Sequence, residues 1–211
     1  MTIDTEALAA RLRTGLLDQA TPLAEGHQGC IHRLEFQGRS LAIKSATGRG
    51  LRGLANRLAL RREARAYRRL SGVAGIPACH GLIDGRWLVL DHIEVRPFRD
   101  GPRRDDYFDR LLTIIEAMHA RGVAHGDLKR KSNLGVDAEG APVLLDFGAS
   151  VVRRAGWHPL NRRLFEWLAQ TDLNAWVKHK HSGYTAVTGT DRIRLKRTWP
   201  ERLAAALRRR N

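Results

Sequence analysis

Apolar and polar positions along the chain follow two different periods, and the period changes near residue 20. Residues 3–17 have the helical period, with an apolar stripe of Ile3, Leu8, Leu12, Leu16 and Leu17. Farther along, CIHRLEF alternates with a period of two, QGR has the composition of a hairpin turn, and SLAIK continues as a second strand. The pattern therefore predicts a helix followed by an antiparallel hairpin.

The next hundred residues return to the helical period twice. Residues 53–70 read as an Arg-rich helix, and DYFDRLLTIIEAMHAR, residues 106–121, reads as a second one. Between them, ACHGLI and RWLVLDHI are predicted strands around the turn DG. Proline and glycine then mark a link near residues 93–104, which is the expected hinge.

The last part of the chain is predicted to be mainly helical. LGV and PVLLDF are short strands around DAEG, and the final 60 residues are helical with breaks near 156–159 and at HSGYTAVTGTD. This order predicts an α+β fold of one domain, with a small antiparallel sheet lobe over residues 1–95 and a helical lobe over 96–211. We expect the N-terminal helix to cover the sheet lobe and a pocket to lie between the lobes.

The charge of the chain is strongly positive. Lys and Arg number 37 against 22 acids, a net charge of +15, which favours anionic partners such as acidic lipid, phosphorylated sugar or nucleic acid. A solvated basic surface is the alternative. The basic stretches carry no nucleic-acid motif with interleaved aromatic residues, so nucleic acid is the less favoured partner.

The two cysteines and the N-terminus indicate the expected compartment. Cys30 and Cys79 form no disulfide framework and no ligand cluster with spacing suited to zinc. The N-terminus lacks the basic start and apolar run of a signal peptide, and no apolar run is long enough to cross a bilayer. We therefore expect a cytoplasmic protein.

Two polar segments carry residues that can act on a phosphate. In HGDLKRKSNLGV, Asp127 could orient an attacking hydroxyl, Lys129 could stabilise phosphoryl charge, and Asn133 could bind a metal through its amide oxygen. In VLLDFG, Asp146 follows an apolar strand and could hold Mg²⁺. The alternative for both segments is a polar turn.

Two further groups could hold a nucleotide. Lys44 ends the strand SLAIK, and Glu63 is the single acid between Lys44 and Asp84, so Glu63 could pair with Lys44 or with neighbouring arginines on its own helix. Gly26 and Gly29 in EGHQGCIHR could let the backbone approach phosphate oxygens, although a plain hairpin would look the same.

Taken together and in this order, these motifs resemble those of the protein kinase-like superfamily. LAIK resembles its V-A-I-K strand, HGDL its H-R-D-L loop and LDFG its metal-binding motif, over roughly residues 20–150. The resemblance implies a two-lobed fold, ATP, Mg²⁺ and phosphoryl transfer. By position it implies Asp127 as the catalytic base, Asn133 and Asp146 as metal ligands, and Lys44 with Glu63 at the nucleotide phosphates. The glycine turn with Gly26 and Gly29 matches the phosphate loop of the family loosely, and the segment DHIE, with Asp91 and Ile93, would meet the adenine.

The chain departs from the family pattern at three places. Asn133 is the sixth residue after Asp127 instead of the fifth, which is Ser132; either the loop carries one extra residue, which we favour, or Ser132 replaces the ligand. Gly126 stands where regulated protein kinases have Arg. After Gly148 there is no A-P-E segment and no long activation loop, so the peptide platform of protein kinases is not expected.

These departures resemble atypical branches of the superfamily: lipopolysaccharide core (Kdo/heptose) sugar kinases, RIO-type kinases and small-molecule phosphotransferases. NRRLFEWL resembles the Asn-and-Arg helix of the lipopolysaccharide kinases. The expected function is an ATP- and Mg²⁺-dependent kinase for a lipopolysaccharide-core sugar or related glycolipid, in peripheral contact with an anionic inner membrane. The alternatives are an atypical Ser/Thr protein kinase and a pseudokinase scaffold.

Several other polar and aromatic residues are expected to be structural. His125 is predicted to brace the loop, and KHKH at 178–181 to be basic surface at the end of a helix. Burial in the terminal helices is expected for Trp157, Trp167, Trp176 and Trp199.

Overall fold

The chain forms two compact units. The computed structural model describes residues 3–26, 29–99, 102–184, 187 and 189–196. Unit 1 consists of Met1–Val95 with Leu145–Gly148, and unit 2 of Arg96–Leu144 with Ala149–Asn211. Unit 1 contains a five-stranded antiparallel sheet and unit 2 is mainly helical, so the fold is α+β, as the sequence predicts.

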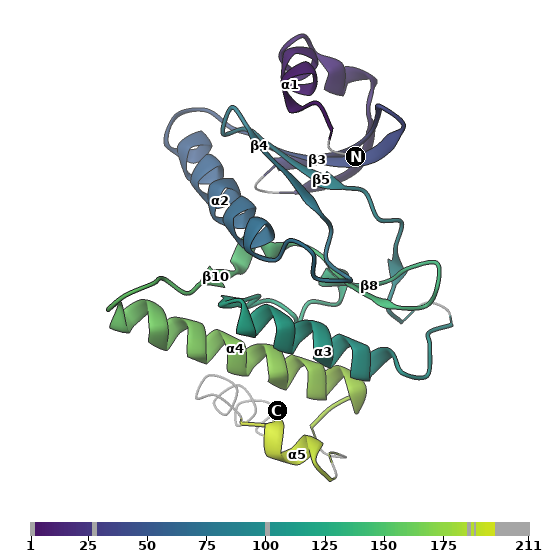
Figure 1. Cartoon of the computed structure of the whole chain (residues 1–211), viewed down its shortest axis with the longest axis vertical. Coiled ribbons are helices and arrows are strands. Elements are labelled where there is room, and N and C mark those ends of the chain that lie inside the picture. Colours follow the sequence, from purple (N-terminus) through teal and green to yellow (C-terminus); the bar gives the residue numbers. More distant parts are fainter. Residues whose placement is uncertain (1–2, 27–28, 100–101, 185–186, 188, 197–211) are drawn as a thin grey trace, which may run out of the picture. The chain divides into compact units, whose positions relative to one another are not determined.

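The sheet of unit 1 is built from two hairpins and an edge strand (Figure 1). Its order is β1-β2-β3-β5-β4, and all neighbours are antiparallel. The strands are β1 (Thr21–Gly26), β2 (Gly29–Phe36), β3 (Arg39–Ala46), β4 (Cys79–Ile83) and β5 (Trp87–Asp91).

Two tight turns of this sheet have the left-handed geometry that a two-residue hairpin needs. Gln37 and Gly38 have φ of 50° and 73°, and Asp84 and Gly85 have φ of 50° and 64°. The turns predicted at QGR and DG are therefore confirmed.

Strand β1 is absent from the sequence prediction. It lies at the sheet edge, its residues Thr21–Ala24 are exposed, and Pro22 is tolerated there because an edge strand has unpaired N–H positions. An edge strand with no buried face gives no alternating signal.

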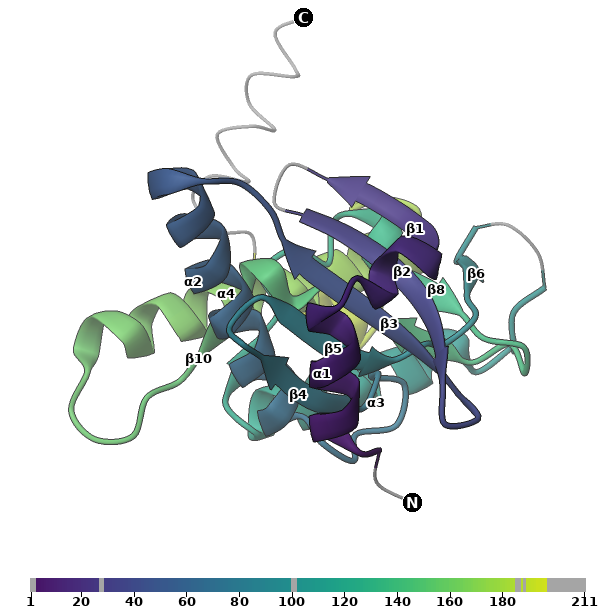
Figure 2. The ribbon, with the colours of Figure 1, turned by 90° about the horizontal axis from the view of Figure 1, so that it is seen from above.

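Helix α1 (Thr5–Arg13) covers one face of the sheet (Figure 2). Asp4 caps it by accepting the N–H groups of Glu6 and Ala7 at 3.1 and 3.0 Å. The predicted helix 3–17 is too long, because Gly15 at φ 90° ends it and a short 3₁₀ helix, η1 (Leu16–Gln19), follows. The apolar stripe of this segment packs, as expected, against the core side chains Leu34, Phe36, Leu41, Ile43 and Val89.

Helix α2 (Gly50–Arg69) packs on the other face of the same sheet (Figure 1). It begins three residues before the predicted start at residue 53. Its buried positions include Leu60, Glu63, Ala64 and Tyr67, so a charged side chain lies on the apolar face of this helix.

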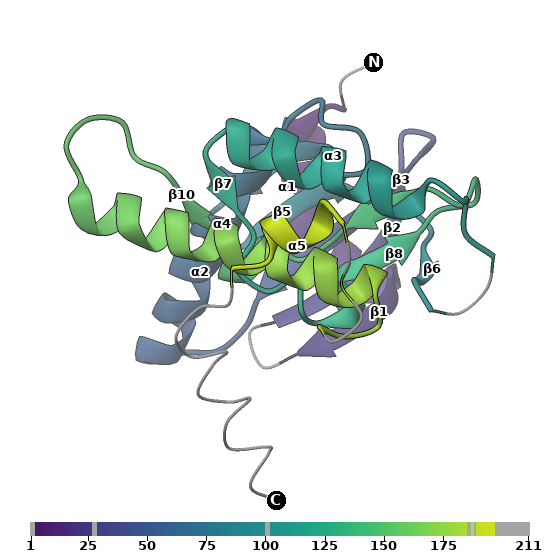
Figure 3. The same cartoon turned by 90° about the horizontal axis from the view of Figure 1, so that it is seen from below.

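Unit 2 is organised around two long helices. α3 (Tyr107–Ala120) and α4 (Pro159–Lys180) lie side by side (Figure 3), and Trp176 Nε1 of α4 donates a 2.7 Å hydrogen bond to the Phe108 carbonyl. The predicted helix at 106–121 is confirmed. Pro159 begins α4, where its missing N–H costs nothing. A single-turn helix, α5 (Asp191–Arg194), follows.

Short strands connect these helices. β7 (Val123–Ala124) pairs with β10 (Val151–Val152), and β6 (Arg96–Pro97), β8 (Leu134–Val136) and β9 (Pro142–Leu144) form a second small sheet. The predicted strand PVLLDF is too long, because β9 ends at Leu144. Asp146 is left-handed at φ 60°, and the 3₁₀ helix η3 (Phe147–Ala149) follows.

Two expectations about structural residues are wrong in part. Trp176 is 1% exposed, but Trp157 is 88% and Trp167 43% exposed; Trp199 lies outside the described residues. In KHKH, His179 is buried at 5% exposure and is not basic surface. Among the described residues, none of the helices has the length and hydropathy of a membrane span.

Candidate active site

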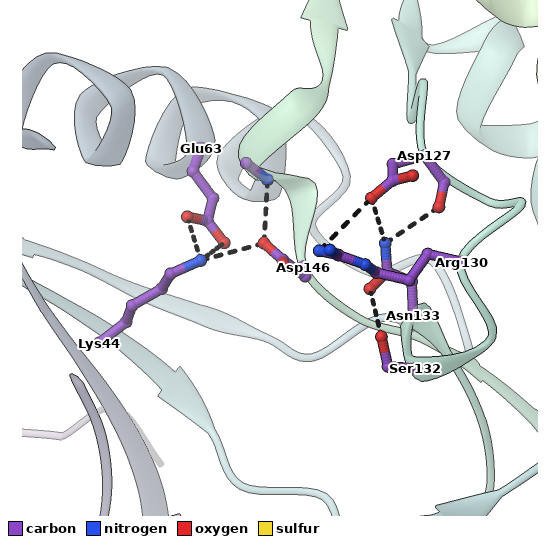
Figure 4. A network of polar contacts seen from close by, with 8 residues as sticks. Lys44, Glu63, Asp127, Arg130, Ser132, Asn133 and Asp146 are labelled. Atoms are coloured by element: carbon purple, nitrogen blue, oxygen red, sulfur yellow. Dashed lines mark hydrogen bonds and ion pairs between the residues drawn. The ribbon is translucent and has the colours of Figure 1, made fainter. Parts of the chain in front are cut away.

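Unit 1 holds the Lys44 ammonium between two carboxylates. Its Nζ lies 2.8 Å from Glu63 Oε2 and 3.0 Å from Asp146 Oδ1, as Figure 4 shows. These three side chains come from β3, from α2 and from the segment Leu145–Gly148, all within unit 1.

The alternation of β3 explains why Lys44 points toward α2. Leu41 and Ile43 are fully buried in the core beneath α1. Successive side chains of a strand point to opposite faces, so Lys44 lies on the face that α2 covers. Glu63 is 2% exposed and pairs with Lys44. The sequence left open whether it would pair with Lys44 or with arginines of its own helix.

Burial and charge act in opposite directions on this pair. Burial alone would lower the pKa of Lys44, but the charges of Glu63 and Asp146 outweigh it, so the pKa is raised and the ammonium stays charged. Burial raises the pKa of Glu63, against the opposing effect of Lys44. The result is a fixed positive charge with little conformational freedom.

Asp146 sits on a turn that presents its carboxylate to solvent. Its side chain is 46% exposed, and Oδ1 accepts both Lys44 Nζ and the Gly148 N–H at 3.2 Å. The next residue, Phe147, is fully buried and packs edge to face on Tyr67 of α2, with ring centroids 4.9 Å apart. Phe147 thus anchors the segment while Asp146 faces outward.

Unit 2 brings together Asp127 and Asn133. Asn133 Nδ2 donates to the Asp127 backbone carbonyl at 3.0 Å and to Asp127 Oδ2 at 3.3 Å (Figure 4). Arg130 Nη1 lies 3.9 Å from the same carboxylate oxygen. With its amide nitrogen toward Asp127, Asn133 has its amide oxygen on the other side, where it accepts the Ser132 hydroxyl at 3.4 Å.

Two consecutive turns accommodate the extra residue of this loop. The Arg130 N–H donates to the Asp127 carbonyl at 3.2 Å, and the Asn133 N–H donates to the Arg130 carbonyl at 3.1 Å. Asn133 is buried at 2% exposure, whereas Ser132 is exposed. Lys129 lies half-buried in the same loop.

Sequence reasoning missed Asp172, which holds this loop in place. Its carboxylate is fully buried in α4 and accepts the N–H groups of His125 and Gly126 at 2.8 and 2.9 Å. It also accepts His119 Nε2 at 3.1 Å. The signal that could have revealed it is an acid in register with Leu168 and Ala175, on the apolar face of a helix.

Two histidines support the loop from either side. The His125 ring is fully buried, and its Nδ1 accepts the Asp127 N–H at 3.3 Å, so it braces the loop as predicted. His179 of α4 donates from Nε2 to the Leu128 carbonyl at 2.9 Å. Burial lowers the pKa of His179, which favours the neutral ring.

The backbone explains Gly126 at the position where regulated kinases have Arg. Its φ is +80°, and a Cβ there would lie 3.0 Å from the Ala149 carbonyl oxygen and 3.3 Å from Leu168 Cδ2. A side chain at this position would be strained and crowded.

The residues predicted to contact the nucleotide, namely Gly26, Gly29, Asp91 and Ile93, lie in the sheet of unit 1 or directly after it. Gly26 and Gly29 face each other across the β1–β2 register, and a Cβ at Gly29 would overlap the Ser45 carbonyl, so the neighbouring strand already requires glycine there. Asp91 Oδ1 contacts His80 Nε2 at 2.7 Å, and its N–H donates to the Ala78 carbonyl at 2.8 Å. Ile93 is half-buried just after β5.

Asp146 and Asn133 each carry an oxygen atom of the kind that can bind magnesium. Within the described ranges, no three His, Cys, Asp or Glu side chains gather as a metal cluster. Magnesium in nucleotide enzymes is bound by one or two protein oxygens plus phosphate and water. An exposed carboxylate at Asp146 and an amide oxygen at Asn133 have that chemistry.

The chain is similar in sequence to parts of known proteins. No family model matches the chain. It is 32% identical, over 60% of its length, to a probable bifunctional tRNA threonylcarbamoyladenosine biosynthesis protein of Methanothermobacter thermautotrophicus. Over 22% of its length it is 48% identical to CBL-interacting protein kinase 30 of Oryza sativa subsp. japonica. The chain spans 24% of the first relative and 10% of the second, so each similarity concerns part of those proteins.

Proposed function

We propose that the chain is an ATP-dependent phosphotransferase that moves the γ-phosphoryl group to a hydroxyl, with unit 1 as the small lobe and unit 2 as the helical lobe of a kinase-like fold. The observation that carries this proposal is the Lys44 ammonium held between Glu63 and Asp146 at 2.8 and 3.0 Å. A buried, oriented ammonium beside an outward-facing carboxylate is suited to a magnesium nucleotide.

In this proposal unit 1 binds the nucleotide. Lys44 holds the α- and β-phosphates, Glu63 fixes the orientation of Lys44, and Asp146 offers an oxygen to the metal. Mg²⁺ supplies charge neutralisation at the phosphates. Gly26, Gly29 and the stretch from Asp91 to Ile93 remain the proposed phosphate and adenine contacts. The Asp91 N–H is used within the sheet, so its contribution would come from its carbonyl.

Unit 2 would orient the acceptor. Asp127 would accept the hydroxyl proton, Lys129 would stabilise the transferred phosphoryl charge, and Asn133 would both hold Asp127 and offer its amide oxygen to the metal. Arg130 Nη1 lies 3.9 Å from the Asp127 carboxylate and would remain beside it.

One of these two relatives supports the reaction class by its name, and both leave the acceptor open. One of them is named as a protein kinase, which favours a protein acceptor as the second candidate. The glycolipid acceptor rests on the sequence resemblance to lipopolysaccharide core kinases, and no relative carries such a name. A pseudokinase scaffold is the reading that remains if nucleotide binds without turnover.

The test is transfer of labelled γ-phosphate by the purified full chain, with Mg²⁺ and separate glycolipid, protein and sugar acceptors. Asp127→Asn is expected to lower turnover by about 10²–10⁴-fold while nucleotide binding persists, because only the proton acceptor is lost. The control is Asp105→Asn, a similar change at an exposed acid of the same unit, which should leave turnover unchanged. Near-normal turnover in Asp127→Asn would remove Asp127 from the catalytic role.

A further inference from the structure

Large apolar side chains line one exposed side of the N-terminal half of α4 and the loop before it. Trp157, Leu160, Leu164 and Trp167 are 88%, 79%, 44% and 43% exposed. Leu160, Leu164 and Trp167 stand at positions i, i+4 and i+7, so they share one side of the helix. We call these four residues the α4 stripe.

The segment that carries the α4 stripe is rich in arginine and poor in acids. Arg153, Arg154, Arg162 and Arg163 are all exposed, and Glu166 is the only acid between residues 153 and 167. Arg162 pairs with Glu166 at 2.8 Å. An exposed apolar stripe on an arginine-rich segment has the composition of a surface that meets an anionic, partly apolar partner.

Hydrogen bonds hold the segment before α4 to the first turn of the helix and to unit 2. Asn161 Oδ1 accepts the Arg154 N–H at 2.7 Å, and Asn161 Nδ2 donates to the Val152 carbonyl at 3.2 Å. The Arg153 N–H donates to the Gly122 carbonyl at 2.7 Å. The first turns of α4 extend beyond α3 in both Figure 1 and Figure 3. The stripe is therefore presented on an ordered, protruding element.

We propose that the α4 stripe docks on the surface of an anionic lipid bilayer. Tryptophan prefers the headgroup level, leucine enters the acyl boundary, and arginine pairs with lipid phosphates while its stem stays apolar. A single-stranded nucleic acid would use aromatic stacking but gain nothing from two exposed leucines. The combination of leucine, tryptophan and an excess of arginine over acids favours lipid, and this inference is independent of the proposed phosphotransferase activity.

Vesicle sedimentation of the full chain tests the proposal. Vesicles of phosphatidylcholine mixed with phosphatidylglycerol should bind the chain, those of phosphatidylcholine alone should bind it weakly, and high sodium chloride should reduce binding to the mixed vesicles. The double variant Trp157→Ser/Leu160→Ser should lose about tenfold or more in partitioning because two inserted side chains are removed. Arg154→Gln/Arg163→Gln should lose binding to the anionic vesicles specifically.

A matched control separates binding through the α4 stripe from nonspecific hydrophobic adsorption to the vesicles. Leu51, on α2, is 87% exposed, and Leu51→Ser removes a comparable apolar side chain elsewhere. It should bind vesicles as the native chain does, and circular dichroism should show all variants folded.

Three outcomes would overturn the proposal. The first is no binding of the native chain to anionic vesicles, and the second is equal binding by the Trp157→Ser/Leu160→Ser variant or an equal loss in Leu51→Ser. The third would be seen by light scattering. If the native chain is a dimer, the double variant is a monomer and vesicle binding is the same for both, then the α4 stripe joins two copies of the chain and does not bind lipid.

Discussion

Gly126 adopts a conformation that an L-residue takes only with strain, and it is crowded as well. Gly126→Ala should lower the free energy of unfolding by about 1–3 kcal/mol, from the left-handed φ of +80° together with a Cβ 3.0 Å from the Ala149 carbonyl oxygen. Chemical denaturation of the variant measures the loss. The control is Gly156→Ala, where φ is +81° but nothing lies within 4 Å of the added Cβ. Equal losses at the two sites would show that crowding contributes nothing at Gly126.

Lys44 compensates a carboxylate that is otherwise buried without a counter-charge. Lys44→Met should destabilise unit 1 by about 3 kcal/mol at neutral pH, because Glu63, 2% exposed, loses its cation. Burial already raises the pKa of Glu63, and removing Lys44 raises it further. The folded variant then binds more protons than the unfolded chain above the usual Glu pKa of 4.5, so its stability falls as pH rises.

Denaturation of the Lys44→Met variant at several pH values checks this sign. Stability should recover as the pH is lowered from neutral toward the usual Glu range. Lys44→Met/Glu63→Gln should remove the part of this dependence that comes from Glu63, because the buried carboxylate is then gone while the exposed Asp146 remains. Equal stability of the Lys44→Met variant at neutral pH and near the usual Glu pKa of 4.5 would contradict the predicted effect of Glu63.

At the scale of elements, the parts with a clear period were predictable. The β2–β3 hairpin and α3 followed from alternation, turn residues and an apolar stripe. Strand β1 was not predictable because an exposed edge strand has no buried face, and the end of α1 was missed because Gly15 interrupts an apolar stripe that continues to Leu17. The apolar stripe alone does not show at which residue along it the helix ends.

The same distinction applies to the candidate site. Glu63 could be singled out because it is the one acid between Lys44 and Asp84, but the sequence left open whether it pairs with Lys44 or with arginines of its own helix. Asp172 stands in register with Leu168 and Ala175, but its partners, the N–H groups of His125 and Gly126 and the His119 ring, lie 46 to 53 residues away. The sequence could therefore mark Asp172 as a buried acid without showing what it binds.

Helix α4 positions the Asp127 loop mainly through Asp172. Asp172→Asn should cost about 2–3 kcal/mol of stability and lower turnover, because an amide nitrogen would replace one of two oxygens that accept the N–H groups of His125 and Gly126. Denaturation and the labelled-phosphate assay measure the two effects. Asp109→Asn, at an exposed acid of α3 with only a 3.7 Å contact to Lys180, is the control and should change neither quantity.

Turnover that stays at the native level in Asp172→Asn, despite the loss of stability, would show that the loop keeps its geometry without this carboxylate. Asp172 would then be a purely structural buried acid.

At the scale of the whole molecule, unit 1 is completed by a segment from far along the chain. Leu145–Gly148 belongs to unit 1, although the residues on both sides of it belong to unit 2. Asp146, one of the two carboxylates at Lys44, therefore reaches unit 1 only if this segment is held there. The buried ring of Phe147 against Tyr67 is the apolar contact that holds it.

Phe147→Ala should therefore separate this anchoring from general core stability. The change should lower the free energy of unfolding by about 3–5 kcal/mol and also weaken Mg-ATP binding, because Asp146 is no longer fixed at Lys44. Phe36→Ala makes the same change in the core beneath α1, away from this segment, and should reduce stability without reducing the nucleotide affinity of the folded protein. Calorimetric titration at a temperature where both variants are folded distinguishes the two effects. Equal affinities in the two variants would mean that Asp146 stays in place without its phenylalanine neighbour.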